Sequence, residues 1–91
     1  MDKREFKKLL NEIVLDHEKV LQIESDNDGW CKAIVYNGYF IYVYTAKDKN
    51  IIFRALASTV GVVSQIAYYF DDEGNLKNTE VLIWHIDIKS Y

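Results

Sequence analysis

Two histidines and one aspartate are the side chains of this sequence that could carry out acid–base or metal chemistry. His85 and Asp87 are two positions apart, so on a β-strand both would point to the same side of the sheet and could contact one ligand. Zinc sites usually need three or four converging ligands, and no pattern places His17 beside this pair. We therefore interpret the pair as a solvated strand end. A small enzyme or ligand binder around His85 and Asp87 is kept as the third hypothesis.

Two acidic turns could be considered for calcium binding and the single cysteine for reactivity, but the sequence supports neither role. Asp26–Gly29 and Asp71–Gly74 share residue types with calcium loops, but both lack the twelve-residue spacing that ends in a bidentate glutamate. Asp, Asn and Gly in such clusters are typical of turns. Cys31 has no evident partner base and no second cysteine to pair with, which favours an inert core thiol and a reducing, cytoplasmic location. We expect no metal, no cofactor and no enzymatic activity.

A basic patch on the expected N-terminal helix is the feature that could contact phosphates or an acidic protein. It consists of Lys3, Arg4, Lys7 and Lys8. Together with aromatic strands it suggests sheet-based binding of single-stranded RNA. However, the net charge of −3 provides no general attraction to phosphate backbones or anionic membranes. A nucleic-acid-binding module that uses these lysines and exposed tyrosines is therefore the second hypothesis.

The first element that positions these residues is an amphipathic helix. Asp2 can cap it, and Glu5 follows three positions later as in a capping box. One apolar stripe follows at helical spacing: Phe6, Leu9, Leu10, Ile13 and Val14. His17 and Leu21 would extend the stripe, so the helix could end anywhere from Asp16 to Gln22. We expect it to end near Glu18, because residues 19–25 then form a strand.

The remaining elements predict an α+β domain with a mainly antiparallel sheet of about five strands. Residues 30–36 and 39–46 flank Asn37-Gly38, a typical type I′ hairpin turn. Residues 50–61 have apolar side chains at helical spacing and predict a second helix, although β-rich Ile51–Phe53 leaves a strand open. A last hairpin is expected from strands 62–70 and 80–88. The order is α-β-β-β-α-β-β in one globular domain, residues 1–91.

The central hairpin is apolar on both of its sides, which raises the question of what covers the second one. With a two-residue turn, one side holds Cys31, Ala33, Val35, Phe40, Tyr42 and Tyr44, and the other holds Trp30, Lys32, Ile34, Tyr36, Tyr39, Ile41, Val43 and Thr45. In the last strand Leu82, Trp84, Ile86 and Ile88 share one apolar face. We therefore expect the Tyr42/Trp84 side to be core. The outer side is either covered by the second helix or is an interface, since uncovered it would exceed the roughly 300–600 Å² of a usual largest patch.

These features favour a small non-enzymatic protein that acts by binding another protein, or a second copy of itself as a homodimer. The expected contact residues are Trp30, Lys32, Tyr36, Tyr39 and Ile41, because Trp and Tyr are enriched in interface cores. Abundant Lys, Asn, Ile, Tyr and Phe without proline indicate an AT-rich phage or bacterial genome. An inhibitor, immunity or anti-defence protein would fit this size. No apolar run is long enough to span a membrane.

Overall fold

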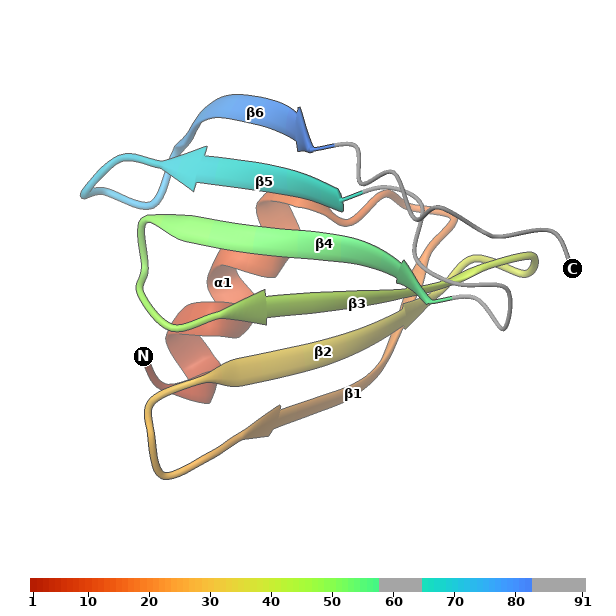
Figure 1. The fold of residues 1–91 in the computed structure, drawn as a ribbon, viewed down its shortest axis with the longest axis horizontal. Helices are drawn as coiled ribbons and strands as arrows, with labels where there is room; N and C mark the ends of the chain where they lie inside the picture. The colour runs from red at the N-terminus through yellow and green to blue at the C-terminus, as the bar shows by residue number, and fades with distance from the viewer. Residues whose placement is uncertain (58–64, 83–91) are drawn as a thin grey trace, which may run out of the picture.

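An N-terminal helix and six strands in chain order make up the fold, as the computed structural model shows for residues 1–57 and 65–82. The elements are α1 (Lys3–Ile13), β1 (Lys19–Ser25), β2 (Cys31–Tyr36), β3 (Ile41–Ala46), β4 (Ile51–Ala57), β5 (Gln65–Phe70) and β6 (Leu76–Leu82). Each strand pairs antiparallel with the next, and α1 lies across one side of the sheet (Figure 1). The expected α+β class is confirmed.

Helix α1 begins as the sequence predicts and ends earlier. Asp2 is the N-cap, and its carboxylate accepts a hydrogen bond of 2.8 Å from the Glu5 backbone N–H. The helix ends at Ile13 rather than near Glu18, because Val14 already has an extended backbone and the chain then turns toward β1. The four buried side chains Phe6, Leu9, Leu10 and Ile13 face the sheet. The predicted strand over residues 19–25 is confirmed as β1.

Strand β4 replaces the expected second helix up to Ala57, where that prediction is wrong, and residues 58–61 of the expected helix lie outside the described residues. β4 pairs with β3 on one edge and with β5 on the other, so its neighbours cover both edges. Ile51, Phe53 and Ala55 alternate with Ile52, Arg54 and Leu56 along it. A strand that is apolar on both sides also satisfies helical spacing, which explains the error. The sheet consequently has six strands, and the segment expected to cover its outer side lies within it.

The β2–β3 hairpin has the predicted sides with a different register. Tyr36 pairs with Ile41, so the loop holds the four residues 37–40 instead of two. The shift moves the pairing by two positions and therefore keeps every paired side chain on its predicted side of the sheet. The one residue displaced from the core is Phe40, which lies in the loop and is 50% exposed.

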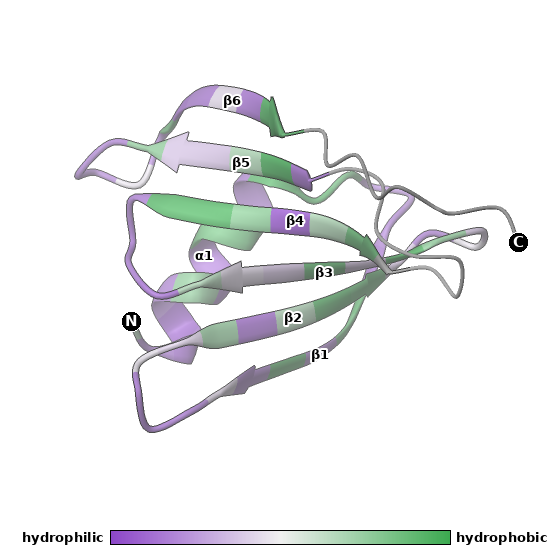
Figure 2. Ribbon diagram, in the orientation of Figure 1, coloured by the Kyte–Doolittle hydropathy of each residue, from purple (hydrophilic) through white to green (hydrophobic). Residues whose placement is uncertain are grey.

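The hydrophobic core lies between α1 and the side of the sheet that carries Ala33 and Tyr44. Its buried members are Phe6, Leu9, Leu10, Ile13, Cys31, Ala33, Val35, Tyr44, Ala46, Ile52, Tyr68 and Phe70. In Figure 2 apolar green recurs along the central strands and on α1. Cys31 is fully buried, and its thiol contacts the Met1 carbonyl oxygen at 3.6 Å. Burial raises the pKa of this thiol, as expected for an inert core cysteine.

In the last hairpin, β6 starts earlier than predicted, and its residues lie on the opposite sides of the sheet from those expected. β6 begins at Leu76, because the loop after β5 closes within residues 71–75. Leu82 pairs with Gln65, and Val81 pairs with Ile66 on the α1 side. Leu82 therefore lies on the outer side, contrary to the expectation that its face is core. Trp84, Ile86 and Ile88 lie outside the described residues. The described part of the chain contains no helix long and apolar enough to cross a membrane.

Candidate functional site

The predicted contact residues fall at two ends of the β2–β3 hairpin. Trp30 precedes β2, with the Lys47 ammonium 5.9 Å from its ring centre. Lys32 forms an ion pair of 3.0 Å with Glu24 on the edge strand β1. This hydrogen-bonded lysine holds the pKa of the Glu24 carboxyl below its usual value. Tyr36, Tyr39 and Ile41 lie at the other end, so the structure does not bring the five residues into one patch.

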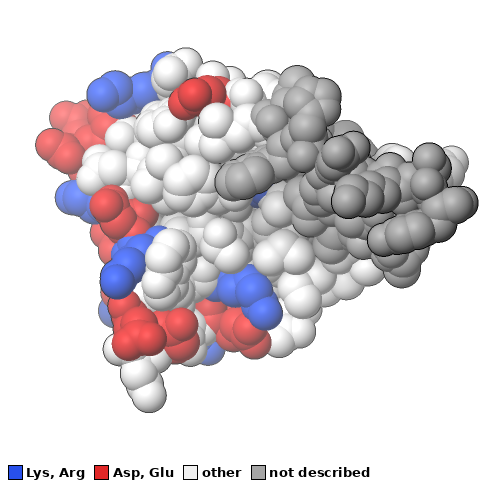
Figure 3. Space-filling view, in the orientation of Figure 1, with Lys and Arg blue, Asp and Glu red and all other residues white. Residues whose placement is uncertain are grey.

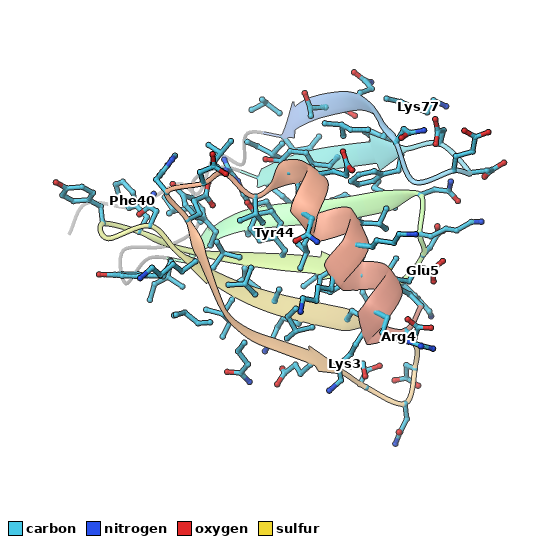
Figure 4. The ribbon with its side chains drawn as sticks, turned by 180° about the vertical axis from the view of Figure 1, so that it is seen from behind. Lys3, Arg4, Glu5, Phe40, Tyr44 and Lys77 are labelled. Carbon is cyan, nitrogen blue, oxygen red and sulfur yellow. The ribbon has the colours of Figure 1, made fainter. Side chains whose placement is uncertain are left out.

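The turn of the hairpin holds two exposed aromatic rings on a hydrogen-bonded backbone. The Asn37 side-chain oxygen accepts hydrogen bonds from the backbone N–H groups of Tyr39 (3.0 Å) and Phe40 (2.7 Å). The Asn37 N–H donates to the Phe40 carbonyl at 3.2 Å, and Gly38 has a φ of +94° that favours glycine. The Tyr39 side chain is 90% exposed. The rings are thus presented by a closed loop, which Figure 4 shows projecting from the molecule at Phe40.

Further exposed apolar side chains lie on the neighbouring edge strand and the loop before it. Lys19 of β1 pairs with Tyr36, so the start of β1 lies at the same end as the turn. A β-bulge between Val20 and Gln22 breaks the register there. We call the whole set the hairpin end, and it consists of Leu15, Val20, Leu21, Tyr36, Tyr39, Phe40 and Ile41. Its members surround the end of the sheet, because Val20 pairs with Val35 on the α1 side whereas Tyr36 and Ile41 pair on the outer side. All seven are exposed by 41% or more.

Sequence reasoning missed four members of the hairpin end. Phe40 was placed in the core by the two-residue turn. Leu21 was read as a possible extension of the helical stripe, and Leu15 and Val20 were not singled out. The bulge at which Val20 and Leu21 remain exposed depends on how β1 pairs with β2. The one available signal was a pair of adjacent apolar residues in an edge strand.

Charged side chains gather at the opposite end of the molecule. No charged residue occurs from Ala33 to Ala46. In Figure 3 the red and blue atoms cluster around the loops that join β1 to β2, β3 to β4 and β5 to β6. Close to the hairpin end the chain carries Asp16 and Lys19, which are exposed and of opposite sign. Among residues 1–57 and 65–82, charged side chains are thus concentrated at the end opposite the hairpin end.

A cluster of buried and half-buried polar groups lies on the α1 side of the sheet. The Arg54 guanidinium carbon lies 4.5 Å from the ring centre of Tyr42, whose hydroxyl accepts a 3.3 Å hydrogen bond from the Asn37 amide. Tyr44 and Tyr68 have ring centres 6.3 Å apart. Through its contact with the Tyr42 ring, Arg54 connects this cluster to Asn37, the residue that closes the turn.

Two oxygens of this cluster are buried without a hydrogen-bond partner. They are the Tyr44 hydroxyl and Glu18 Oε2. Arg54 and Tyr68 approach the Tyr44 hydroxyl closely enough for weak hydrogen-bonding contacts that affect its pKa, but neither contact has the full geometry of a hydrogen bond. Burial raises the pKa of Tyr44 and of Tyr68, because a tyrosinate would lose its hydration there. A buried polar group without a partner loses its hydration, so replacing either group with an apolar one should raise the free energy of unfolding.

The other predicted sites lie apart from the hairpin end. The basic patch of Lys3, Arg4, Lys7 and Lys8 is exposed on α1, and Figure 4 places Lys3 and Arg4 at the opposite end from Phe40. Beside it, a cleft of about 260 Å³ is lined by charges of both signs from Glu5, Lys8, Glu12, Lys49, Asp72 and Glu73. His17 is exposed. His85 and Asp87 lie outside the described residues.

The two acidic turns behave as turn chemistry predicts. Asp26 Oδ1 accepts backbone hydrogen bonds from Asp28 and Trp30, and Asp71 Oδ1 accepts them from Glu73 and Asn75. These bonds lower the pKa of Asp71. Within residues 1–57 and 65–82, no three His, Cys, Asp or Glu side chains converge on a point that could hold a metal ion.

Comparison of the chain with protein families, with curated proteins and with solved structures gives no match.

Proposed function

We propose that this chain is a small non-enzymatic protein that acts by binding another protein, and that the hairpin end is its contact surface. The observation that carries the proposal is the Asn37-closed turn, which presents Tyr39 with 90% of its surface exposed. A large aromatic ring on an ordered loop can be buried by a partner with little loss of backbone entropy. Tyrosine is also among the residues that most often dominate binding energy.

The proposal includes the class of protein that the size and composition suggest. An inhibitor, immunity or anti-defence protein of phage or bacterial origin acts by covering a surface of its target and needs no catalytic group. The uncharged stretch from Ala33 to Ala46 suits such a role, because interface cores are depleted of charged residues. The charged far end would then remain in solvent and keep the protein soluble.

The test is capture of a partner from cells of the source organism with matched variants at the two ends of the hairpin. The chain would be immobilised as wild type, as the double variant Tyr39→Ser/Phe40→Ser, and as Trp30→Ser. Trp30 is the control, because it is an exposed aromatic residue (42%) at the charged end. Urea unfolding would first establish that all three fold.

We expect one or more proteins to be retained by the wild type and by Trp30→Ser, and to be lost with the double variant. Equal retention by all three forms would show that the hairpin end is not the contact surface. The Trp30→Ser form losing the same proteins would move the surface to the other end of the hairpin.

A further inference from the structure

We infer that Asn37 is a site of covalent modification, at which the loop of the β2–β3 hairpin promotes conversion of the asparagine to aspartate and isoaspartate through a cyclic imide. The inference goes beyond the proposed function and does not depend on it. Of the six asparagines in the chain, Asn37 alone is followed by a glycine, Gly38. Glycine has no Cβ to hinder ring closure by its own backbone nitrogen.

The reaction needs only water and a base from the solvent. The base removes the proton of the Gly38 N–H, and the nitrogen attacks Cγ of Asn37, so that negative charge develops on Oδ1. The Cγ–Nδ2 bond then breaks, and the leaving nitrogen takes a proton from water and departs as ammonia. Water opens the five-membered imide at either of its two carbonyls. One water is consumed and one ammonia released, without oxidation or reduction, and the attack is intramolecular.

Two backbone donors already point at the oxygen on which this charge develops. The N–H groups of Tyr39 and Phe40 lie 3.0 Å and 2.7 Å from Asn37 Oδ1. Donors at about 2.7–3.1 Å from a developing oxyanion stabilise the transition state of such an attack. The oxygen stays bonded to Cγ throughout the attack and so remains beside the same donors. The loop therefore supplies an oxyanion hole for its own asparagine.

The attacking nitrogen is accessible, and the side-chain amide is held in place. Gly38 is exposed, and within the described part of the chain its N–H donates no hydrogen bond. In the same part, a Cβ at Gly38 would meet nothing within 4 Å apart from its chain neighbours, so a base in the solvent can reach the N–H. Asn37 Nδ2 donates to the Tyr42 hydroxyl at 3.3 Å, which limits rotation of the amide away from the two donors.

The two products have different effects on the loop. Aspartate at position 37 keeps an oxygen that can accept from Tyr39 and Phe40, but it adds a negative charge and loses the donor to Tyr42. In isoaspartate the accepting oxygen becomes a main-chain carbonyl, and the main chain gains a methylene group. The closed loop cannot keep its hydrogen bonds with that longer backbone, so the modification changes how Tyr39 is presented.

The experiment compares conversion in the folded chain with conversion in the same chain unfolded in about 6 M guanidinium chloride, at one mildly alkaline pH. Mass spectrometry of proteolytic peptides measures the gain of about 1 Da at each asparagine. We expect Asn37 to convert about 3- to 10-fold faster in the folded chain, because the two donors act there but are exposed to water. The internal controls, which should convert far more slowly, are Asn11, Asn27, Asn50, Asn75 and Asn78.

Two variants at position 39 test whether the donors are the cause. Tyr39→Pro removes the N–H that donates to Oδ1, whereas Tyr39→Ala keeps it. The Tyr39 side chain is 90% exposed, so neither change removes core packing. The ratio of the folded rate to the unfolded rate corrects for direct effects of the new residue on the chemistry. We expect Tyr39→Ala to retain the wild-type ratio and Tyr39→Pro to lower it to about 1 or less.

Circular dichroism and urea unfolding would establish that both variants are folded. Two results would overturn the inference. One is a wild-type chain that converts at Asn37 no faster when folded than when unfolded, because the loop would then protect the asparagine. The other is an equal ratio for the folded Tyr39→Pro and Tyr39→Ala variants, because the backbone donors would then have no part in the reaction.

Discussion

Replacing Tyr44 by phenylalanine should stabilise the fold, although Tyr44 is the largest completely buried side chain in the described part of the chain. The substitution removes one hydroxyl and keeps the ring, which packs beside Tyr68 with ring centres 6.3 Å apart. In most buried tyrosines the hydroxyl is hydrogen-bonded and its loss is destabilising. Here the hydroxyl is buried with only weak contacts to Arg54 and Tyr68 and no hydrogen bond of full geometry, so we expect the opposite sign.

The magnitude follows from two opposing terms. A buried polar group without a partner costs about 1–3 kcal/mol of desolvation, which phenylalanine avoids. The space left by one oxygen atom costs a few tenths of a kcal/mol, at about 24 cal/mol per Å³ of cavity. We therefore expect Tyr44→Phe to raise the free energy of unfolding by about 0.5–2 kcal/mol. Tyr44→Ala, which removes the ring as well, should lower it by about 3–5 kcal/mol.

Urea unfolding followed by circular dichroism at pH 7 measures both changes. It should be repeated at two protein concentrations, because association would add to the apparent stability. Tyr39→Phe is the matched control: it removes the same hydroxyl from a side chain that is 90% exposed, and it should change stability by less than about 0.5 kcal/mol. If Tyr44→Phe lowers stability by about 1 kcal/mol or more, the hydroxyl makes a favourable hydrogen bond and our account of the buried cluster is wrong.

Three further predictions concern ionisation and the basic patch. Burial raises the pKa of Tyr44 and Tyr68 above 10.0. The stability that the two neutral side chains contribute is therefore complete below pH 10 and is lost as the pH rises through the raised values. Tyr44→Phe should reduce this loss in urea titrations at alkaline pH, and an unchanged loss would contradict the prediction. Hydrogen bonding to the Glu5 N–H lowers the pKa of Asp2 below 3.8, so its contribution is present above that pH and is lost as the pH falls through the lowered value. Asp2→Asn retains a capping oxygen and should show a smaller loss of stability between pH 4 and pH 2 than the wild type, whereas an identical acid profile would argue against the cap. Fluorescence anisotropy at about 150 mM salt should detect no sub-micromolar binding of single-stranded RNA; tight binding that Lys3→Glu/Lys7→Glu abolishes would favour the nucleic-acid hypothesis instead.

The central hairpin shows why the sides of a sheet are easier to predict than its register. The sequence predicts a two-residue turn at Asn37-Gly38, whereas the Asn37 side chain closes a four-residue loop. Because side chains alternate with a period of two, this error leaves Tyr44 on the core side and Tyr36 on the outer side. A shift by one residue would have reversed both. The position of Phe40 depended on the loop itself and was therefore mispredicted.

The error at β4 arises from burial rather than from local preference. Residues 51–56 of β4 are buried or half-buried on both sides of the sheet, and a strand without a fully solvated side is apolar at nearly every position, which removes the alternation that identifies a strand. Ile51–Phe53 favours a strand, while the apolar spacing up to Val60 also fits a helix. Pairing with β3 and β5 favours the strand over the helix. Neither pairing can be predicted from the residues of this segment alone.

Local chemistry in the sequence was sufficient to predict the start of α1, the strand over residues 19–25 and the two sides of the hairpin. These features depend on neighbouring residues alone: a cap three positions from its N–H donor, a stripe of period 3.6 and an alternation of period two. Only the tertiary structure decided that Val20 and Leu21 face solvent at a bulge, that Arg54 lies over Tyr42, and that the Tyr44 hydroxyl has no partner. Each of these depends on which strands become neighbours, and strand pairing is set by the packing of the whole sheet against α1, which no short segment encodes.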